Sequence, residues 1–263
     1  MSGAVETPVG RRLGTSAGRR LRALGRAELA LLGRNRGAVV TALLVPLALP
    51  FTVRGAYTRL DLKAHGVSAG IAMLTAAIGF SFLFAVYTVL VGAFVARREE
   101  LVLKRLRTGE LSDAEILTGT ALPAVGLGLA QVLVLSVGCA LLLHTGPPKA
   151  PWLILPGLLS GFVVSAALAA VTASFTRTTE SAQVTALPLL LVSMLGSGIT
   201  VPAAALPDRI ASLCALLPLS PAIRLVEAGW TGRPSGPGTP AALAWTVVAV
   251  FAVRRWFRWE PRR

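Results

Sequence analysis

The chain has 263 residues, of which 54% are hydrophobic and only 14% are charged. Soluble domains carry about 25% charged residues, so this composition excludes an ordinary soluble domain and indicates a membrane protein. Basic residues outnumber acidic ones 26 to 12, and in a membrane protein such an excess reports orientation and contact with anionic lipid rather than nucleic-acid binding. The two cysteines, Cys139 and Cys214, form neither a metal-ligand spacing nor a disulfide framework.

Residues 1–36 form a basic tail with eight arginines and no apolar run of membrane length. Within this tail, residues 19–33 place leucines and arginines on opposite sides of a helix, which predicts an amphipathic helix lying on the inner membrane surface. A signal peptide does not fit, because the basic region is too long and no small-residue cleavage site follows an apolar core.

Six apolar stretches then make residues 37–259 a single all-α membrane domain, which leaves a short tail at 260–263. The second stretch, with 31 residues, is longer than a perpendicular helix needs and is expected to tilt or to protrude toward the cytosol. The first stretch contains Pro46 and Pro50, which predict a kink near its outer end. The six predicted spans cover residues 37–53, 66–96, 114–143, 152–174, 182–201 and 239–257.

A densely charged segment, residues 97–119, separates the second and third spans. Glutamates open its first half, basic residues close it and a glycine follows, an order that complements a helix dipole and predicts a short helix. Residues 112–115 then form a capping box for the third span. Apolar and charged side chains fall on opposite sides of the short helix, with Val102, Leu103 and Leu106 against Glu100, Lys104 and Arg107.

The distribution of basic residues predicts which side of the membrane each segment occupies. With the N-terminus inside, the cytosolic segments hold 19 lysines and arginines and the outer segments hold 7. Because positive charge concentrates on the cytosolic side, both termini are predicted to be cytosolic.

The longest outer connection, residues 202–238, is predicted to carry two short amphipathic helices that lie at the outer interface or dip into it. The first begins at a cap on Asp208 and ends at Pro218. The second begins at Ser220 and Pro221 and is predicted to end at Gly229.

The residue types that the six spans lack argue against several classes of membrane protein. Their interiors contain no Asp, Glu, Lys or Arg, and the two histidines, His65 and His144, fall at outer ends, which argues against an ion-coupled transporter. The sequence shows no catalytic triad, zinc motif or pair of intramembrane carboxylates, so it predicts no catalytic residue and no metal site. Without a phosphate-binding loop the chain cannot hold ATP itself, so energy for transport must come from another protein.

Three segments carry a family resemblance over about residues 20–258. The first is the charged segment, from Arg98-Glu99-Glu100 through Leu103-Lys104-Arg105-Leu106-Arg107 to Leu111-Ser112 and Glu115-Ile-Leu-Thr-Gly119. The others are Glu28 to Arg36 before the first span and Pro218 to Pro221 leading to Glu227. Together they resemble permease subunits of bacterial ABC transporters, in the type-2 exporter class that includes drug-efflux permeases. Gly109-Glu110 departs from the Thr-Pro of many members, although either pair breaks a helix.

The resemblance implies a half-transporter of six helices that pairs with a second copy, as a homodimer, and with two copies of a separate ATPase subunit. The ATPase would bind ATP and magnesium, and this chain would bind no cofactor. A helix over about residues 98–107 would seat in a groove of the ATPase, whose closure would tilt spans two and three. The implied coupling residues are Glu99, Glu100, Val102, Leu103, Lys104, Arg105, Leu106 and Arg107.

The resemblance also implies efflux of a hydrophobic or amphipathic compound, a drug or natural product, across a bacterial plasma membrane. The alternative within transport is an exporter of lipid or lipid-linked glycan. The alternative outside transport is a membrane scaffold or sensor that binds a partner through the charged segment. A neighbouring gene for an ATPase would favour transport.

Some intramembrane residues invite sharper roles. Phe80, Phe84 and Tyr87 line one side of the second span and, with Met194, are candidates for a hydrophobic substrate path, although helix packing explains the same stripe. The pair Gly157 and Gly161 allows close helix approach. The small residues at 193 and 196–198 would permit sliding at a seam between two copies.

The predicted topology is testable by cysteine accessibility. Single cysteines at positions 59 and 233 are expected to react with a membrane-impermeant reagent added outside the cell, because both positions lie in outer segments. Cysteines at positions 104 and 258 are expected to stay unlabelled from that side. External labelling at position 104 would overturn the topology.

Overall fold

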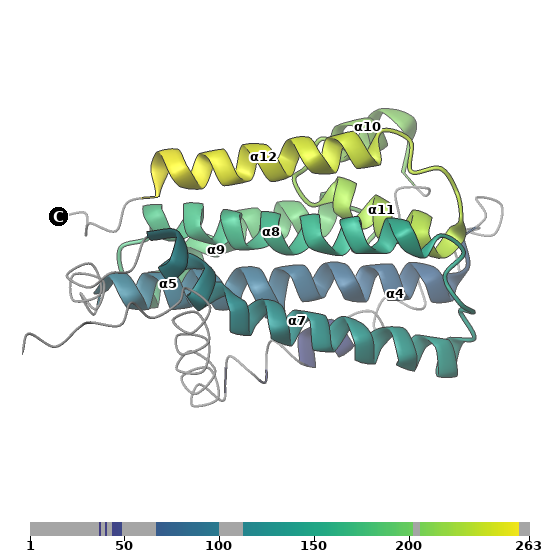
Figure 1. The fold of residues 1–263 in the computed structure, drawn as a ribbon, viewed down its shortest axis with the longest axis horizontal. Helices are drawn as coiled ribbons and strands as arrows, with labels where there is room; N and C mark the ends of the chain where they lie inside the picture. Colours follow the sequence, from purple (N-terminus) through teal and green to yellow (C-terminus); the bar gives the residue numbers. More distant parts are fainter. Residues whose placement is uncertain are drawn as a thin grey trace, which may run out of the picture.

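The computed structural model describes residues 37, 40, 44–48, 67–99, 113–201 and 206–257. These residues fold into a bundle of helices that run side by side, without a strand among them, which confirms the all-α prediction (Figure 1). The predicted interfacial helix, most of the first span and residues 100–107 of the predicted coupling helix lie outside the described residues. The elements are α4 (Ala69–Phe80), the π-helix η1 (Ser81–Thr88), α5 (Val89–Glu99), α7 (Asp113–Leu143), α8 (Pro151–Phe175), α9 (Thr179–Gly196), α10 (Asp208–Cys214), α11 (Ser220–Thr231) and α12 (Gly238–Trp256).

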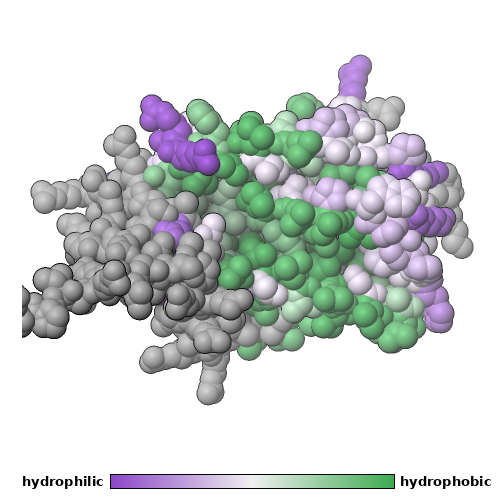
Figure 2. All heavy atoms as spheres, viewed as in Figure 1, coloured by the Kyte–Doolittle hydropathy of each residue, from purple (hydrophilic) through white to green (hydrophobic). Residues whose placement is uncertain are grey.

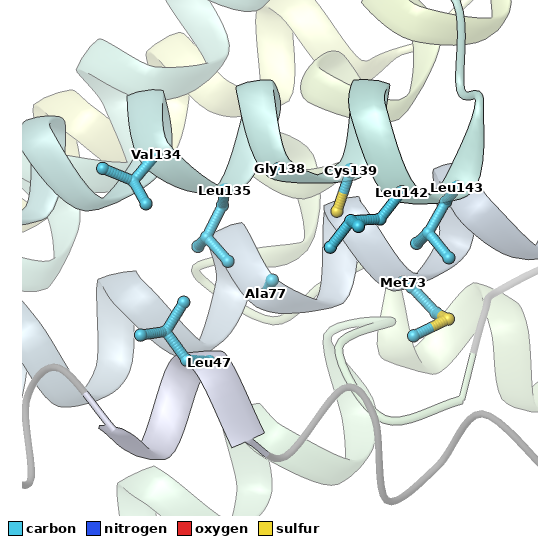
Figure 3. Close-up of a pocket in the computed structure, with 9 residues that line it drawn as sticks. All are labelled: Leu47, Met73, Ala77, Val134, Leu135, Gly138, Cys139, Leu142 and Leu143. Carbon is cyan, nitrogen blue, oxygen red and sulfur yellow. The ribbon is translucent and has the colours of Figure 1, made fainter.

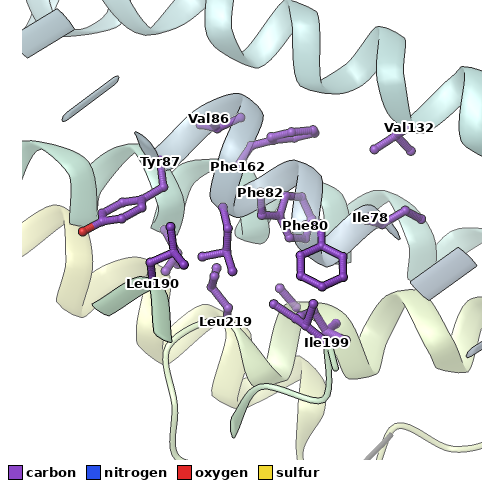
Figure 4. Close-up of a cluster of buried hydrophobic side chains, with 14 of the residues drawn as sticks. Ile78, Phe80, Phe82, Val86, Tyr87, Val132, Phe162, Leu190, Ile199 and Leu219 are labelled. Carbon is purple, nitrogen blue, oxygen red and sulfur yellow. The ribbon is translucent and has the colours of Figure 1, made fainter. Parts of the chain in front are cut away.

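The elements α4, η1 and α5 join end to end into one central helix of 31 residues, which lies at the core of the bundle. Ser68 caps its start, with Oγ accepting a hydrogen bond from the N–H of Ile71 at 3.2 Å. The helix is apolar on nearly every side, as expected for a helix that neighbours cover all round. It supplies most of the largest fully buried side chains, part of whose cluster is drawn in Figure 4: Tyr87, Phe80, Phe82, Phe94, Leu74, Ile78, Leu83 and Leu90.

Small residues set how closely α8 approaches its neighbours. At Gly161, an added Cβ would lie 2.3 Å from the ring of Phe82 in η1. One turn earlier, an added Cβ at Gly157 would lie 3.0 Å from the carbonyl oxygen of Ala222 in α11. The two glycines therefore let α8 contact two elements at once, which confirms the predicted close helix approach.

Of the two predicted short outer helices, α11 is inserted into the bundle. It packs against α4, α8 and α12, and most of its residues are buried. The predicted end at Gly229 is wrong, because this glycine lies inside α11, where an added Cβ would be 2.3 Å from Cγ1 of Ile154 in α8. The helix ends instead at Thr231, and the next residue, Gly232, has a φ of 73°, the left-handed conformation that favours glycine.

The fifth predicted span, residues 182–201, is wrong at its second boundary. The helix in this position, α9, ends at Gly196, and Gly198 then adopts a φ of 79°. The chain turns back there, and the buried side chain of Ile199 packs against Gly79 in α4. The helix therefore stops before the predicted end, and the N–H of Thr200 donates to the carbonyl oxygen of Met194 at 3.2 Å in the turn that follows.

Three of the described helices are long and apolar enough to cross a membrane: residues 69–99, 115–143 and 151–175. They correspond to predicted spans two, three and four. The helices α9 and α12 occupy the positions of spans five and six, and the count of six spans stays a prediction. An apolar belt covers the middle of the face shown in Figure 2, with hydrophilic residues toward both ends, as expected for a protein in a bilayer.

The close contact at Gly161 gives a stability prediction. Gly161→Ala is expected to lower the free energy of unfolding by about 1–3 kcal/mol, because the new methyl group overlaps the Phe82 ring. Gly126→Ala in α7 is the matched control, since a Cβ there meets nothing within 4 Å. Thermal unfolding of both purified variants in one detergent measures the difference, and equal melting temperatures would show that the contact between α8 and η1 adapts freely.

Candidate functional site

The predicted coupling residues connect to the bundle at the end of α5 and the start of α7. Glu99 is the last residue of α5 and is exposed, and α7 starts at Asp113. Both points lie at the end of the bundle where α8 ends and α9 begins (Figure 1). We call residues 100–112, which join them, the coupling segment. Seven of the predicted residues lie in it and outside the described residues, so their roles stay predictions: Glu100, Val102, Leu103, Lys104, Arg105, Leu106 and Arg107.

Arg98, two residues before the coupling segment, is buried, with only 6% of its surface exposed. Its Nη1 donates to the backbone carbonyl oxygens of Ala173 and Thr176, the second at 3.4 Å. These carbonyls belong to the C-terminal end of α8, where backbone acceptors lack helical partners and the negative end of the helix dipole lies. The guanidinium therefore donates hydrogen bonds to carbonyl groups at the end of α8, and the dipoles of these carbonyls stabilise the buried charge.

The charge pattern alone groups Arg98 with the charged residues that follow it in the sequence. Helical spacing is the signal that identifies its position, because Leu90, Phe94 and Arg98 recur every four residues and all three are buried. Arg98 extends the buried face of α5 by one turn beyond the apolar run.

Hydrogen bonds hold the turn between α8 and α9 in a defined conformation. Thr176 donates from Oγ1 to the carbonyl oxygen of Thr172 at 2.9 Å. Thr178 then caps α9, because the N–H of Ser181 donates to Thr178 Oγ1 and the N–H of Thr178 donates to Ser181 Oγ, at 3.3 and 3.2 Å. Arg98 therefore contacts a turn that is already ordered by its own bonds.

Tyr87, in η1, makes a second polar link between the central helix and its neighbours. Its hydroxyl oxygen lies 3.1 Å from Thr172 Oγ1 in α8 and donates to the carbonyl oxygen of Ala186 in α9 at 3.3 Å. The side chain is buried, so these bonds form away from solvent. They tie the middle of the central helix to α8 and α9.

The other residues predicted for a substrate path pack in the core. Phe80 is buried and Phe84 is half-buried, and their ring centroids lie 6.3 Å apart. Met194 packs against the same core from α9. Ser193 and Ser197, two of the small residues predicted for a seam between copies, are buried within this chain. These residues all serve internal packing here, and a role in substrate movement or at a seam stays a hypothesis.

An apolar cavity of about 230 Å³ lies between α4, α7 and the short described stretch at 44–48 (Figure 3). Side chains of α7 point toward α4 across it, and Leu47 lies on its third side (Figure 3). Val134 and Leu142 in its lining are largely exposed, so the cavity opens onto the apolar surface of the bundle. Its lining is apolar apart from one free thiol, and consists of Leu47, Met73, Ala77, Val134, Leu135, Gly138, Cys139, Leu142 and Leu143.

This lining determines what kind of molecule the cavity suits. An apolar cavity of about 150 Å³ holds benzene, so the present one has room for an apolar group such as a segment of an acyl chain. An occupant would gain apolar contact, with the weakly polar thiol of Cys139 as its one possible hydrogen-bond partner in the lining. Nowhere in the described part of the chain do three metal-ligating side chains lie together.

Glu227, which ends the third resembling segment, lies half-buried in α11. Burial raises the pKa of its carboxyl group above the usual value, and the charges of Arg224 and Arg233 offset only part of this rise. Arg224 also donates to the carbonyl oxygen of Ala211 at 3.2 Å, which links α11 to α10. These groups support the pair of short helices and are not part of the cavity lining.

Apolar helices of membrane length, two of them joined at one end of the bundle by a charged segment, are the architecture of a multi-pass membrane protein. A family model described as ABC-2 type transporter matches residues 19–229, which is most of the chain, and the chain therefore belongs to this family. It is a permease component of an ABC transporter, and in this family the ATPase activity resides in separate subunits. A comparison with curated proteins finds no match.

The cavity gives a binding prediction. In lipid nanodiscs, a fatty acid with a diazirine in its acyl chain is expected to photo-cross-link to α7 around Cys139, because the cavity admits an apolar chain from the bilayer. Gly138→Leu is expected to reduce this yield several-fold. Gly138 lines the cavity and a Cβ there meets nothing within 4 Å, so a leucine side chain is expected to take up part of the cavity volume.

Gly126→Leu is the matched control on the same helix. Its Cβ also enters open space, but the residue lies outside the cavity lining. Mass spectrometry of the α7 peptides measures the yield, and equal cross-linking in the two variants would contradict binding in this cavity.

Proposed function

We propose that the chain is the permease of an ABC exporter that moves a hydrophobic or amphipathic compound, such as a drug or natural product, out of a bacterial cell. The position of the coupling segment carries the proposal, because this segment connects α5 and α7 at one end of the bundle in a chain of the ABC-2 type family. A permease without a phosphate-binding loop needs such a connection to receive work from an ATPase.

In the proposed assembly, two copies of this chain pair with two ATPase subunits, which hold ATP and magnesium. Each copy has six spans in the plasma membrane, with both termini in the cytosol. The 19 basic residues of the segments on that side against 7 on the other support this orientation. The end of the bundle that carries Glu99 and Asp113 then faces the ATPases.

The apolar cavity supports a hydrophobic cargo. Its lining offers apolar contact, and it opens onto the surface that the bilayer would cover. The same opening favours a second candidate, export of a lipid or lipid-linked glycan, because an acyl chain reaches the cavity from the bilayer without passing through water. Membership of a transporter family leaves a scaffold or sensor role with less support.

The two faces of the coupling helix are expected to differ in their contribution to ATPase binding. Leu106→Glu is expected to release the ATPase, because burying one such apolar side chain stabilises a complex by about 1.5–3 kcal/mol. Glu100→Gln is the matched control on the charged face, where a single exposed ion pair contributes about 0–1 kcal/mol. Co-purification of the partner ATPase with each variant measures the binding.

Efflux of the apolar dye N-phenyl-1-naphthylamine from cells measures transport in the same variants. Leu106→Glu is expected to abolish efflux while the permease still inserts, because the spans that direct insertion lie elsewhere. If Leu106→Glu retains both the ATPase and the efflux of the parent protein, the coupling helix is only a surface helix, and the proposed function loses its main support.

A further inference from the structure

We propose that Arg98 is a positioning residue that fixes the base of the coupling segment to the turn between α8 and α9. A push on the segment would then move α5, the end of α8 and the start of α9 together, so that the motion reaches more than the two helices that the segment joins. This inference rests on the proposed function, because it concerns where the work of the ATPase is delivered.

The contact of Arg98 is suited to carrying force. Its guanidinium bonds to two backbone carbonyls, those of Ala173 and Thr176, which belong to the last turn of α8 and the residue that follows it. Backbone acceptors at a helix end move with the helix axis rather than with a flexible side chain. Both bonds come from one nitrogen, Nη1, which carries two N–H groups and can donate to two carbonyls at once.

A second link prevents α5 from pivoting about this contact. Tyr87, eleven residues before Arg98, bonds to Thr172 of α8 and to Ala186 of α9, so it attaches the central helix to α8 a second time and to α9 as well. At a rise of about 1.5 Å per residue, the two links lie about 16 Å apart along the central helix. Two attachment points so far apart resist rotation as well as sliding, so α5 follows α8 and α9 as one body.

The neighbouring arginine provides an internal comparison. Arg97 is half-buried on a different face of α5, whereas Arg98 is on the face toward α8. The two residues carry the same charge at nearly the same distance from the coupling segment. A difference between their variants therefore reports the contact with α8 rather than the loss of a positive charge.

The first test measures the contact in the permease alone. Nitroxide labels on Ala96→Cys and Arg177→Cys, in a background without the two native cysteines, report the distance between α5 and the turn after α8 in nanodiscs. The parent protein is expected to show one narrow distribution of distances. Arg98→Gln is expected to broaden this distribution and shift it to longer distances, Arg98→Lys to recover part of the change, and Arg97→Gln to match the parent.

A second pair of labels, at Lys149 and Arg233 near the opposite end of the bundle, checks that Arg98→Gln still folds. This pair is expected to give the parent distribution in every variant. If Arg98→Gln leaves the 96–177 distribution unchanged while the 149–233 pair is also unchanged, Arg98 does not hold α5 to the turn, and the inference is overturned.

The second test adds the ATPase with ATP and vanadate, which trap it after hydrolysis. In the parent protein the 96–177 distance is expected to stay constant, because the helices move together. In Arg98→Gln the same pair is expected to separate, although the ATPase still co-purifies and hydrolyses ATP. A parent distance that changes with trapping as much as that of Arg98→Gln would overturn the single-body movement.

A label at Lys104 separates this inference from the proposed function. Its mobility is expected to fall when the ATPase binds the coupling segment. An unchanged spectrum at Lys104 would contradict the proposed function while the first test still decides whether Arg98 holds the turn. A changed spectrum at Lys104 with no effect of Arg98→Gln would leave the proposed function standing and reject the role of Arg98.

Discussion

The structure depends on the requirement that a helix surrounded by lipid or protein satisfy its own backbone hydrogen bonds and bury side chains without strong polarity. The central helix meets it with an apolar surface that its neighbours cover on nearly all sides. Dense packing around such a helix requires small residues on its partners. An added Cβ at Gly161 in α8 would lie 2.3 Å from the Phe82 ring of η1, and one at Gly128 in α7 would lie 3.1 Å from Val86 of η1. The neighbouring helices pack around this central helix.

Polar side chains of the central helix reach backbone carbonyls of its neighbours. Arg98 donates to carbonyls at the end of α8, and Tyr87 donates to the carbonyl of Ala186, inside α9. The two residues thereby attach the central helix to α8 and to α9. The cost of burying the charge of Arg98 is offset by its bonds to carbonyl dipoles at the C-terminal end of α8.

Long apolar runs made much of the fold predictable from the sequence. The predicted spans at 66–96, 114–143 and 152–174 fall within three residues of the helices at 69–99, 113–143 and 151–175. The sequence failed where a boundary depends on a distant partner. Ile199 turns back toward Gly79, and Gly229 continues α11 because it fits against Ile154, contacts that no local pattern records.

For the candidate site, the sequence predicted where the charged segment lies but not the contact between Arg98 and α8. The charged segment was identified, and its two attachment points lie together at one end of the bundle (Figure 1). The burial of Arg98 was not predicted, because a run of charged residues is typical of an exposed surface. Only its spacing of four residues from Phe94 indicates that it lies on the buried face of α5. The cavity was unpredictable, because it forms between helices whose relative position the sequence does not specify.

The π-helix η1 has a consequence for the phase of the central helix. A π turn closes with hydrogen bonds from residue i to i+5, and each extra residue that it absorbs rotates everything after it by about 100° about the axis. The angular position of α5 relative to α4 is therefore set by the winding of residues 81–88. If the π turn lost its extra residue and became α-helical, Leu90, Phe94 and Arg98 would rotate away from α8. The contact of Arg98 at the end of the helix therefore depends on the hydrogen-bond pattern of η1 near its middle.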